Sequence, residues 1–165
     1  RLQGANLTAW EMRERGIAHQ LVADGAGALL MSRGDIDIVL VGADRVTRNG
    51  DVCNKVGTYP KALAAQDNGV AFYVALPSPT LDTGLAIGSD VPIEARDGDE
   101  LLVVNGRDGA GVLTGVRIAP EGTRALNFAF DITPARLVTG LITERGVIAA
   151  SEPALRAAFA ERFAP

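Results

Sequence analysis

The feature that most restricts the fold of this 165-residue chain is an alternation of helix and strand signals over residues 7–80. Apolar runs bounded by glycine or proline predict strands, and the segments between them show helical spacing and glycine stops. The sequence predicts, in order, helix 9–15, strand 19–23, helix 25–33, strand 36–41, helix 54–68 and strand 70–76. This order predicts an α/β fold, a Rossmann-like parallel sheet flanked by helices on both faces, with right-handed crossovers.

Local signals support some of these boundaries. Thr8 and Glu11 match a capping box at the start of the first helix. Gly16, Gly34 and Gly69 stand where the three helices should stop. The run 36–41 is almost wholly aliphatic, which predicts a strand buried on both faces.

Residues 82–124 interrupt the alternation because they are rich in Gly and Asp. Two apolar runs, 101–104 and 112–118, flank Asn105-Gly106, so we expect a Gly-rich hairpin or an irregular excursion here.

Two more helices are expected after this excursion. Thr133 predicts a cap and Pro134 a helix start, followed by apolar residues that would share one face: Leu137, Val138, Leu141 and Ile142. The final helix would present Leu155, Phe159 and Phe163 at i, i+4 and i+8. Without a repeat or a linker, residues 1–165 should form a single α/β domain.

A polar cluster is predicted at the end of the buried strand 36–41. Asp44 follows this strand closely, and open parallel sheets bind ligands beyond the carboxyl ends of their strands. Asn54 and Lys55 come ten residues later, where the predicted helix 54–68 would begin and its N–H groups would favour an anion. The cluster therefore combines a carboxylate, an amide and a cation.

Composition excludes several classes of function. A net charge of -4 with scattered Lys and Arg argues against nucleic acid binding. A single cysteine allows no internal disulfide, and no apolar run is long enough to cross a membrane. These features predict a soluble protein of a reducing, cytoplasmic compartment. Because the chain begins with Arg1 rather than methionine, we expect it to be a segment of a longer protein.

Five motifs stand in register along nearly the whole chain: residues 3–11 (QGANLTAWE), 42–45 (GADR), 49–58 (NGDVCNKVGT), 77–82 (PSPTLD) and 130–134 (FDITP). Together they resemble the C-terminal domain of the methylthioribose-1-phosphate isomerases. This family belongs to a superfamily that also contains ribose-1,5-bisphosphate isomerases and the regulatory subunits of translation initiation factor 2B.

The resemblance implies an aldose-to-ketose isomerisation of 5-methylthioribose 1-phosphate in methionine salvage, without a cofactor or a metal. It implies that Asp44 is the catalytic acid and that Gln3, Asn54 and Lys55 contact the phosphorylated sugar. A carboxyl group can act as an acid near neutral pH when a desolvated pocket raises its pKa, and we expect such a pocket around Asp44. The resemblance also implies a homodimer.

The sequence departs from the family pattern in one large respect. The family's catalytic cysteine and phosphate-binding arginines lie in an N-terminal domain that this chain lacks, so the segment alone should be inactive. Cys53 is not that cysteine and is best explained as a small buried residue. A thiol with a lowered pKa, near Lys55 and a helix start, is the alternative.

Other interpretations remain open at this point. Asp44 could instead cap a turn or pair with Arg45. Asp51 could be a second acid or part of an Asn-Gly-Asp turn. The whole chain could be a scaffold or regulatory subunit related to initiation factor 2B, or part of a ribose-1,5-bisphosphate isomerase, because fold alone does not decide function. A scaffold has no need to keep Asp44, Asn54 and Lys55 together, which favours an enzyme.

Several further residues are expected to have structural roles only. Gly25-Ala-Gly lacks the third glycine of a dinucleotide-binding loop, so these glycines indicate helix packing. His19 has no partners at metal-ligand spacing and is expected at a strand edge. Asp131 is expected to tie the last helix to the sheet.

Overall fold

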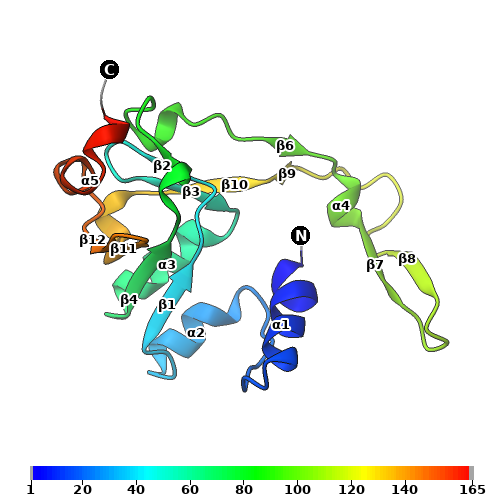
Figure 1. Cartoon of the computed structure of the whole chain (residues 1–165). Coiled ribbons are helices and arrows are strands. Elements are labelled where there is room, and N and C mark those ends of the chain that lie inside the picture. Colours follow the sequence, from blue (N-terminus) through cyan, green and yellow to red (C-terminus); the bar gives the residue numbers. More distant parts are fainter. Residues whose placement is uncertain (1, 164–165) are drawn as a thin grey trace. The chain divides into compact units, whose positions relative to one another are not determined.

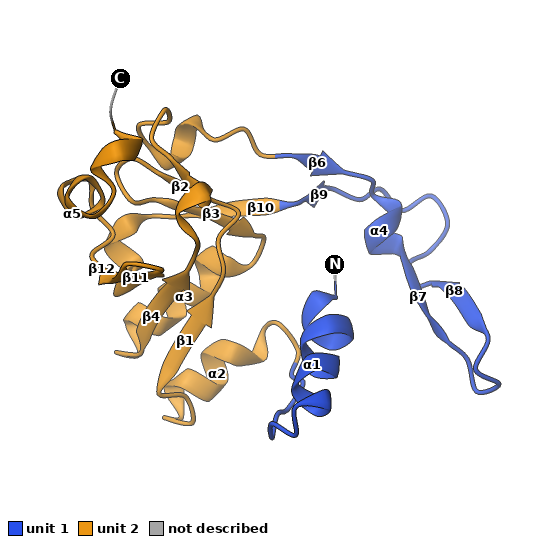
Figure 2. Ribbon diagram, viewed as in Figure 1, with its two compact units in different colours: residues 1–22, 94–129 blue, residues 23–93, 130–165 orange. Residues whose placement is uncertain are grey.

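The computed structural model describes residues 2–163 and divides the chain into two compact units (Figure 2). The smaller unit contains the N-terminal residues up to 22 and residues 94–129. The larger unit contains residues 23–93 and the chain from 130 onward. The larger unit holds Asp44, Asn54 and Lys55, and the smaller one holds Gln3.

The first sheet of the larger unit has the strand order β1-β4-β11-β12 (Figure 1). Its strands are β1 (Ile38–Val41), β4 (Ala71–Ala75), β11 (Gly140–Thr143) and β12 (Gly146–Ile148). The first three are parallel, and β12 pairs antiparallel with β11. The fold is therefore a mixed α/β one, and the strands predicted at 36–41 and 70–76 are confirmed. The prediction that the first of them is buried on both faces is wrong, because Ile38 and Leu40 on the edge strand β1 are exposed.

A second sheet carries the predicted polar cluster and has the order β10-β3-β2-β5. Its strands are β2 (Arg45–Thr47), β3 (Val52–Lys55), β5 (Leu81–Asp82) and β10 (Phe130–Thr133). β3 pairs antiparallel with both β2 and β10. The prediction of a helix starting at Asn54 is therefore wrong, since pairing with β10, far away in sequence, holds Asn54 and Lys55 in a strand.

The described part of the larger unit contains three α-helices: α2 (Ala26–Ser32), α3 (Thr58–Asp67) and α5 (Glu152–Ala158). They confirm a helix after residue 25, a helix ending before Gly69, and a final helix. α3 begins directly after Gly57, whose φ of 100° lies in the left-handed region that favours glycine. Short 3-10 helices complete the unit: Ser78–Thr80, Gly88–Asp90, Ala135–Leu137 and Ala160–Arg162.

The helix predicted from Pro134 through Ile142 is wrong. A 3-10 turn at Ala135–Leu137 is followed by β11, which lies between β4 and β12. The same apolar residues fit either a helix face or a buried strand, and the pairing of β11 with β4 decides for the strand.

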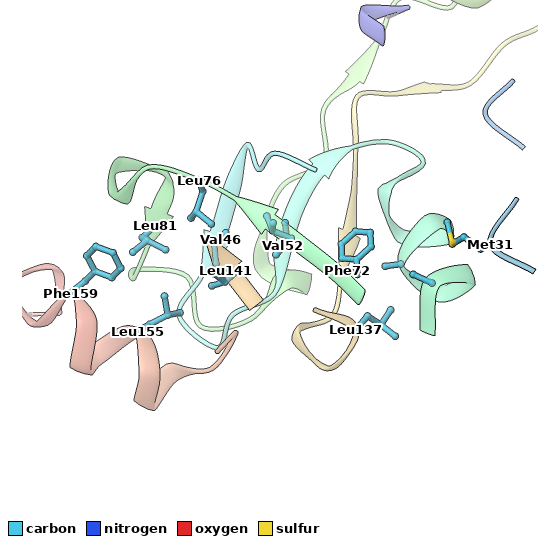
Figure 3. Close-up of a cluster of buried hydrophobic side chains, with 13 residues drawn as sticks. Met31, Val46, Val52, Phe72, Leu76, Leu81, Leu137, Leu141, Leu155 and Phe159 are labelled. Atoms are coloured by element: carbon cyan, nitrogen blue, oxygen red, sulfur yellow. The ribbon is translucent and has the colours of Figure 1, made fainter. Parts of the chain in front are cut away.

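The core of the larger unit joins both sheets and α5 (Figure 3). It is built from Val46 and Val52 of the second sheet, Phe72 and Leu141 of the first, and a C-terminal set, Leu155 and Phe159, with Phe163 packed against it. Leu155 and Phe159 are buried as the i, i+4 spacing predicts, although α5 ends at Ala158 and Phe159 lies beyond it. Through Val46 and Val52, the core anchors β2 and β3, the two strands that carry the polar cluster.

The smaller unit starts with a π-helical turn, Gly4–Thr8, that continues into α1 (Ala9–Glu14). α1 confirms the first predicted helix, but Thr8 is itself helical and makes no cap bond, so the capping box is wrong. Residues 19–23 form no strand, because no described strand pairs with them. The remaining elements are α4 (Asp99–Leu102), β6 (Ala95–Arg96), β7 (Val103–Arg107), β8 (Leu113–Arg117) and β9 (Asn127–Phe128).

β7 and β8 form an antiparallel pair within the region that interrupts the alternation. Asn105 and Gly106 lie inside β7 rather than in a turn. The connection is made instead by residues 108–112, where the carboxylate of Asp108 accepts hydrogen bonds from the N–H groups of Ala110 and Val112. None of the described helices is both long and apolar enough for a membrane span.

Candidate functional site

Asp44 lies three residues beyond the carboxyl end of β1 and directly before β2. Its N–H donates a 3.0 Å hydrogen bond to the carbonyl oxygen of Cys53, which is already the register partner of Arg45. Two successive residues thus face one residue of β3, which is the pattern of a β-bulge. Bulges of this kind redirect a side chain next to a site, and here the residue concerned is the predicted acid.

The side chain of Asp44 is exposed and has no hydrogen-bond or ion-pair partner among residues 2–163. The desolvated pocket expected around it is therefore not formed by the described part of the chain. Two surface hollows of the larger unit lie elsewhere. One lies along α3, and the other is lined by residues 69–71 and 136–139 at the amino ends of β4 and β11, whereas Asp44 follows a carboxyl end.

Asn54 is half-buried within β3, and its side-chain amide is bonded on one side only. Nδ2 donates to Oγ1 of Thr58 over 3.0 Å. Thr58 is buried, and its hydroxyl in turn donates to the carbonyl oxygen of Lys55 over 2.6 Å. The amide oxygen of Asn54 has no partner among the described residues.

Lys55 follows Asn54 on the same strand, so its side chain leaves the opposite face of the sheet. Its ammonium lies 5.9 Å from the ring centroid of Phe130, its register partner on β10. No carboxylate of the described residues lies within ion-pair distance of it. The cation is therefore available, but on the other face from the Asn54 amide.

The N-terminus of α3 is not open to an external anion, contrary to the prediction for a helix starting at Asn54. The carboxylate of Asp131 accepts hydrogen bonds from the N–H groups of Gly57 (2.7 Å) and Tyr59 (3.1 Å). Asp131 is the register partner of Asn54. It therefore ties β10 to the start of α3, and the prediction that it ties the last helix to the sheet is wrong. No local pattern could reveal a bond that spans 74 residues.

Asp51 is bonded more completely than a turn residue requires. Its carboxylate accepts hydrogen bonds from the N–H groups of Gly88 (2.9 Å) and Ala135 (2.9 Å) and from Nδ2 of Asn49 (2.8 Å). Gly88 must approach closely, because a Cβ there would overlap Ile132. Asp51 thus joins three segments, and it is the structure rather than the sequence that identifies this role.

Cys53 is buried, at 3% exposure, as the interpretation of a small core residue predicts. Burial, and secondly the negative charge of Asp44, raise the pKa of its thiol. The alternative of a lowered pKa is therefore wrong, and the thiol stays protonated near neutral pH.

Arg45 does not pair with Asp44. Its guanidinium instead makes a 2.6 Å ion pair with Asp82 at the end of β5. The pair joins two of the motifs, 42–45 and 77–82, and leaves the carboxylate of Asp44 unbonded.

The structure thus brings Asp44, Asn54 and Lys55 to one end of the paired strands β2 and β3. Gln3 is exposed and belongs to the smaller unit. His19 is also exposed in that unit, where its Nδ1 lies 2.8 Å from the carbonyl oxygen of Ile17 rather than at a strand edge. In the described part of the chain no His, Cys, Asp or Glu residues cluster in a way that would hold a metal ion.

A family model and several curated proteins match this chain over most of its length. The model of the initiation factor 2 subunit family matches residues 1–150. The methylthioribose-1-phosphate isomerase of Rhizobium meliloti (strain 1021) is 60% identical over 163 residues, which are 98% of this chain and 45% of that protein. The isomerase of Escherichia coli O45:K1 (strain S88) is 59% identical over 155 residues, 94% of this chain and 42% of that protein. The chain thus spans less than half the length of these curated relatives.

Solved structures resemble the chain closely. The 5-methylthioribose 1-phosphate isomerase from Pyrococcus horikoshii OT3 has a TM-score of 0.85 and 40% identity, covering 97% of this chain and 42% of that one. The translation initiation factor eIF-2B subunit delta from A. fulgidus has a TM-score of 0.83 and 39% identity, covering 96% of this chain and 44% of that one. Structural similarity alone therefore does not separate the two kinds of relative.

Proposed function

Because the chain belongs to the initiation factor 2 subunit family, we propose that it is the C-terminal part of a longer sugar-phosphate isomerase. The substrate is 5-methylthioribose 1-phosphate, and the product is 5-methylthioribulose 1-phosphate. Identity of about 60% to named isomerases over nearly the whole chain supports this choice of substrate. The observation that carries the proposal is the set Asp44, Asn54 and Lys55, which shares one end of β2 and β3 and keeps groups unbonded there.

The reaction needs an acid because the phosphate at C1 keeps the sugar in its ring form. Ring opening breaks the bond between C1 and the ring oxygen, and this oxygen takes up a proton. Hydrogen then moves from C2 to C1. The hydroxyl at C2 releases its proton and becomes a carbonyl, and this proton replaces the one that the acid gave to the ring oxygen. In the proposal Asp44 supplies the acid, which is a role that typically accelerates a step by about 10²- to 10⁴-fold.

Asp44 is exposed in this chain because the domain that would cover it belongs to the rest of the longer protein. In the longer protein, the N-terminal domain forms the other wall of the site and shields the carboxyl group of Asp44 from water. Lys55 attracts the phosphate as a point charge, and Gln3 and Asn54 make polar contacts to the sugar. The segment alone is inactive, because it lacks that wall.

The remaining parts of the proposal rest on the resemblance. They are a Rossmann-like arrangement of one catalytic-type domain over residues 1–165, a cytoplasmic homodimer, and turnover without a cofactor or a metal.

Turnover by the full-length protein tests the function. We expect Asp44→Asn to lower kcat for 5-methylthioribose 1-phosphate by about 10²- to 10⁴-fold, since an amide cannot donate the acid proton. Asp37→Asn is the matched control, because Asp37 is also exposed but stands at the amino end of β1. Parent-like turnover by Asp44→Asn would remove Asp44 from the reaction.

A scaffold function is the second candidate, supported by the similarity to the eIF-2B delta structure. The same assay separates the two, because a scaffold would show no turnover in the parent protein. Ribose 1,5-bisphosphate serves as the competing substrate, and a higher kcat/KM for it would reassign the enzyme to the bisphosphate branch.

A further inference from the structure

We propose that Thr58 is a positioning residue, whose hydroxyl sets the orientation of the Asn54 amide and so determines which of its atoms meets the substrate. This inference rests on the proposed function, because it gives Asn54 a contact to the sugar. Thr58 is 5% exposed and is the first residue of α3, so it acts through Asn54 and not by touching the substrate itself.

The orientation follows from the number of hydrogens available. A threonine hydroxyl has one hydrogen to donate and lone pairs that accept. That hydrogen is given to the carbonyl oxygen of Lys55 over 2.6 Å. Toward Asn54 the hydroxyl can therefore only accept, and the group 3.0 Å away must be the amide nitrogen.

The consequence is that the amide oxygen of Asn54 and its second N–H are left for a ligand. The oxygen has no partner among the described residues. An amide oxygen only accepts hydrogen bonds, and so do the oxygens of a phosphate dianion, so these two groups do not bond. The group that suits the Asn54 oxygen is a sugar hydroxyl, whereas the phosphate suits the ammonium of Lys55.

Thr58 is well placed to hold this geometry because both of its neighbours are fixed. The N–H groups of Gly57 and Tyr59 are bonded to the carboxylate of Asp131. Asp131 lies opposite Asn54 in the register of β10 and β3. The start of α3 and the strand that carries Asn54 are thus fastened to the same residue.

Four variants of the full-length isomerase test the inference. We expect Asn54→Ala to lower kcat/KM by about thirtyfold or more, and Thr58→Val to lower it by about tenfold, the equivalent of one hydrogen bond. Thr58→Ser keeps the hydroxyl and should stay within about threefold of the parent. The double variant Thr58→Val with Asn54→Ala should match Asn54→Ala within about twofold, because the hydroxyl has no effect once the amide is gone.

Thr133→Val is the matched control. It makes the same change at another buried threonine, but the hydroxyl of Thr133 has no hydrogen-bond partner in the described chain. We expect its kcat/KM to stay within about twofold of the parent. Should Thr58→Val be recovered unfolded, Thr58→Ala provides the same comparison.

The outcomes are distinguishable. If the losses of the two single variants multiply in the double variant, Thr58 acts independently of Asn54 and the inference is overturned. If Thr58→Val keeps parent activity while Asn54→Ala loses it, the inference alone fails. If Asn54→Ala keeps parent activity, the assigned contact of Asn54 fails together with the inference, and the Asp44→Asn assay still decides the proposed function.

Discussion

The hairpin of β2 and β3 has two ends whose polar side chains are used differently: at its turn they bond to the protein, and at its other end they stay largely unbonded. The turn end contains Thr47, Asn49 and Asp51. The hydroxyl of Thr47 donates to the side-chain oxygen of Asn49 (2.7 Å), and Asp51 accepts three hydrogen bonds. This end therefore uses its polar groups to hold the fold.

The open end contains Asp44, Asn54 and Lys55. Among the described residues, Asp44 is exposed without a hydrogen-bond or ion-pair partner, and the ammonium of Lys55 has only the ring of Phe130 near it. Asn54 uses a single N–H of its amide there. Groups that bond to solvent in both the folded and the unfolded chain contribute little to stability. The two ends of one hairpin can therefore serve different roles: the polar groups at the turn stabilise the fold, and those at the open end are free to contact a ligand.

Asp51→Ala should show the largest effect on stability. The variant leaves the N–H groups of Gly88 and Ala135 without their acceptor, and hydrogen bonds to a carboxylate are among the stronger ones. We expect the free energy of unfolding to fall by about 3 kcal/mol, measured by urea denaturation. Asp37→Ala, at an exposed site, should change it by less than about 0.5 kcal/mol. An equal effect of both variants would remove the distinction between the turn end and the rest of the surface.

The sequence predicts the helices and strands that local signals determine and misses the strands that depend on long-range pairing. Strands 36–41 and 70–76 and the helices after residues 8 and 25 follow from apolar runs and glycine stops, and β1, β4, α1 and α2 confirm them. Asn54 and Lys55 of β3 and residues 140–142 of β11 are predicted as helix, but each strand owes its conformation to a partner distant in sequence, β10 for β3 and β4 for β11. Periodicity in a short apolar run does not contain that information.

The candidate site follows the same rule. Asp44 could be found from the sequence because it closely follows the aliphatic run 36–41, and its position three residues beyond β1 agrees. The roles of Asp131 and Thr58 could not, since one bonds across 74 residues and the other depends on which acceptor receives the single hydrogen of the hydroxyl. The bulge that redirects Asp44 depends on the pairing of β2 with β3, which the motif letters do not reveal.

Thr133→Val should change the free energy of unfolding by a smaller amount than Asp51→Ala and in the opposite direction. Thr133 is the register partner of Val52, next to the turn end, yet its hydroxyl is buried without a hydrogen-bond partner in the described chain. Valine has the same shape and removes this unpaired group. We expect the free energy of unfolding to rise by about 1 kcal/mol in urea denaturation. A fall of the same size would mean that the hydroxyl is bonded in solution and that the turn end is satisfied throughout.

Asp44→Asn should have the smallest effect on stability, although the same variant is expected to lose most of its turnover. The carboxylate is exposed and has no bonding partner in residues 2–163, and an exposed polar substitution of similar size changes the free energy of unfolding by less than about 0.5 kcal/mol. Urea denaturation of this chain measures it, with Asp51→Ala as the reference for a bonded carboxylate. A loss of about 1.5 kcal/mol or more would show that Asp44 stabilises the fold. A small change in stability combined with a large loss of kcat in the full-length protein would instead show that Asp44 contributes to the reaction and not to the stability of the fold. Only a group that the fold does not need can be replaced with so small a change in the free energy of unfolding.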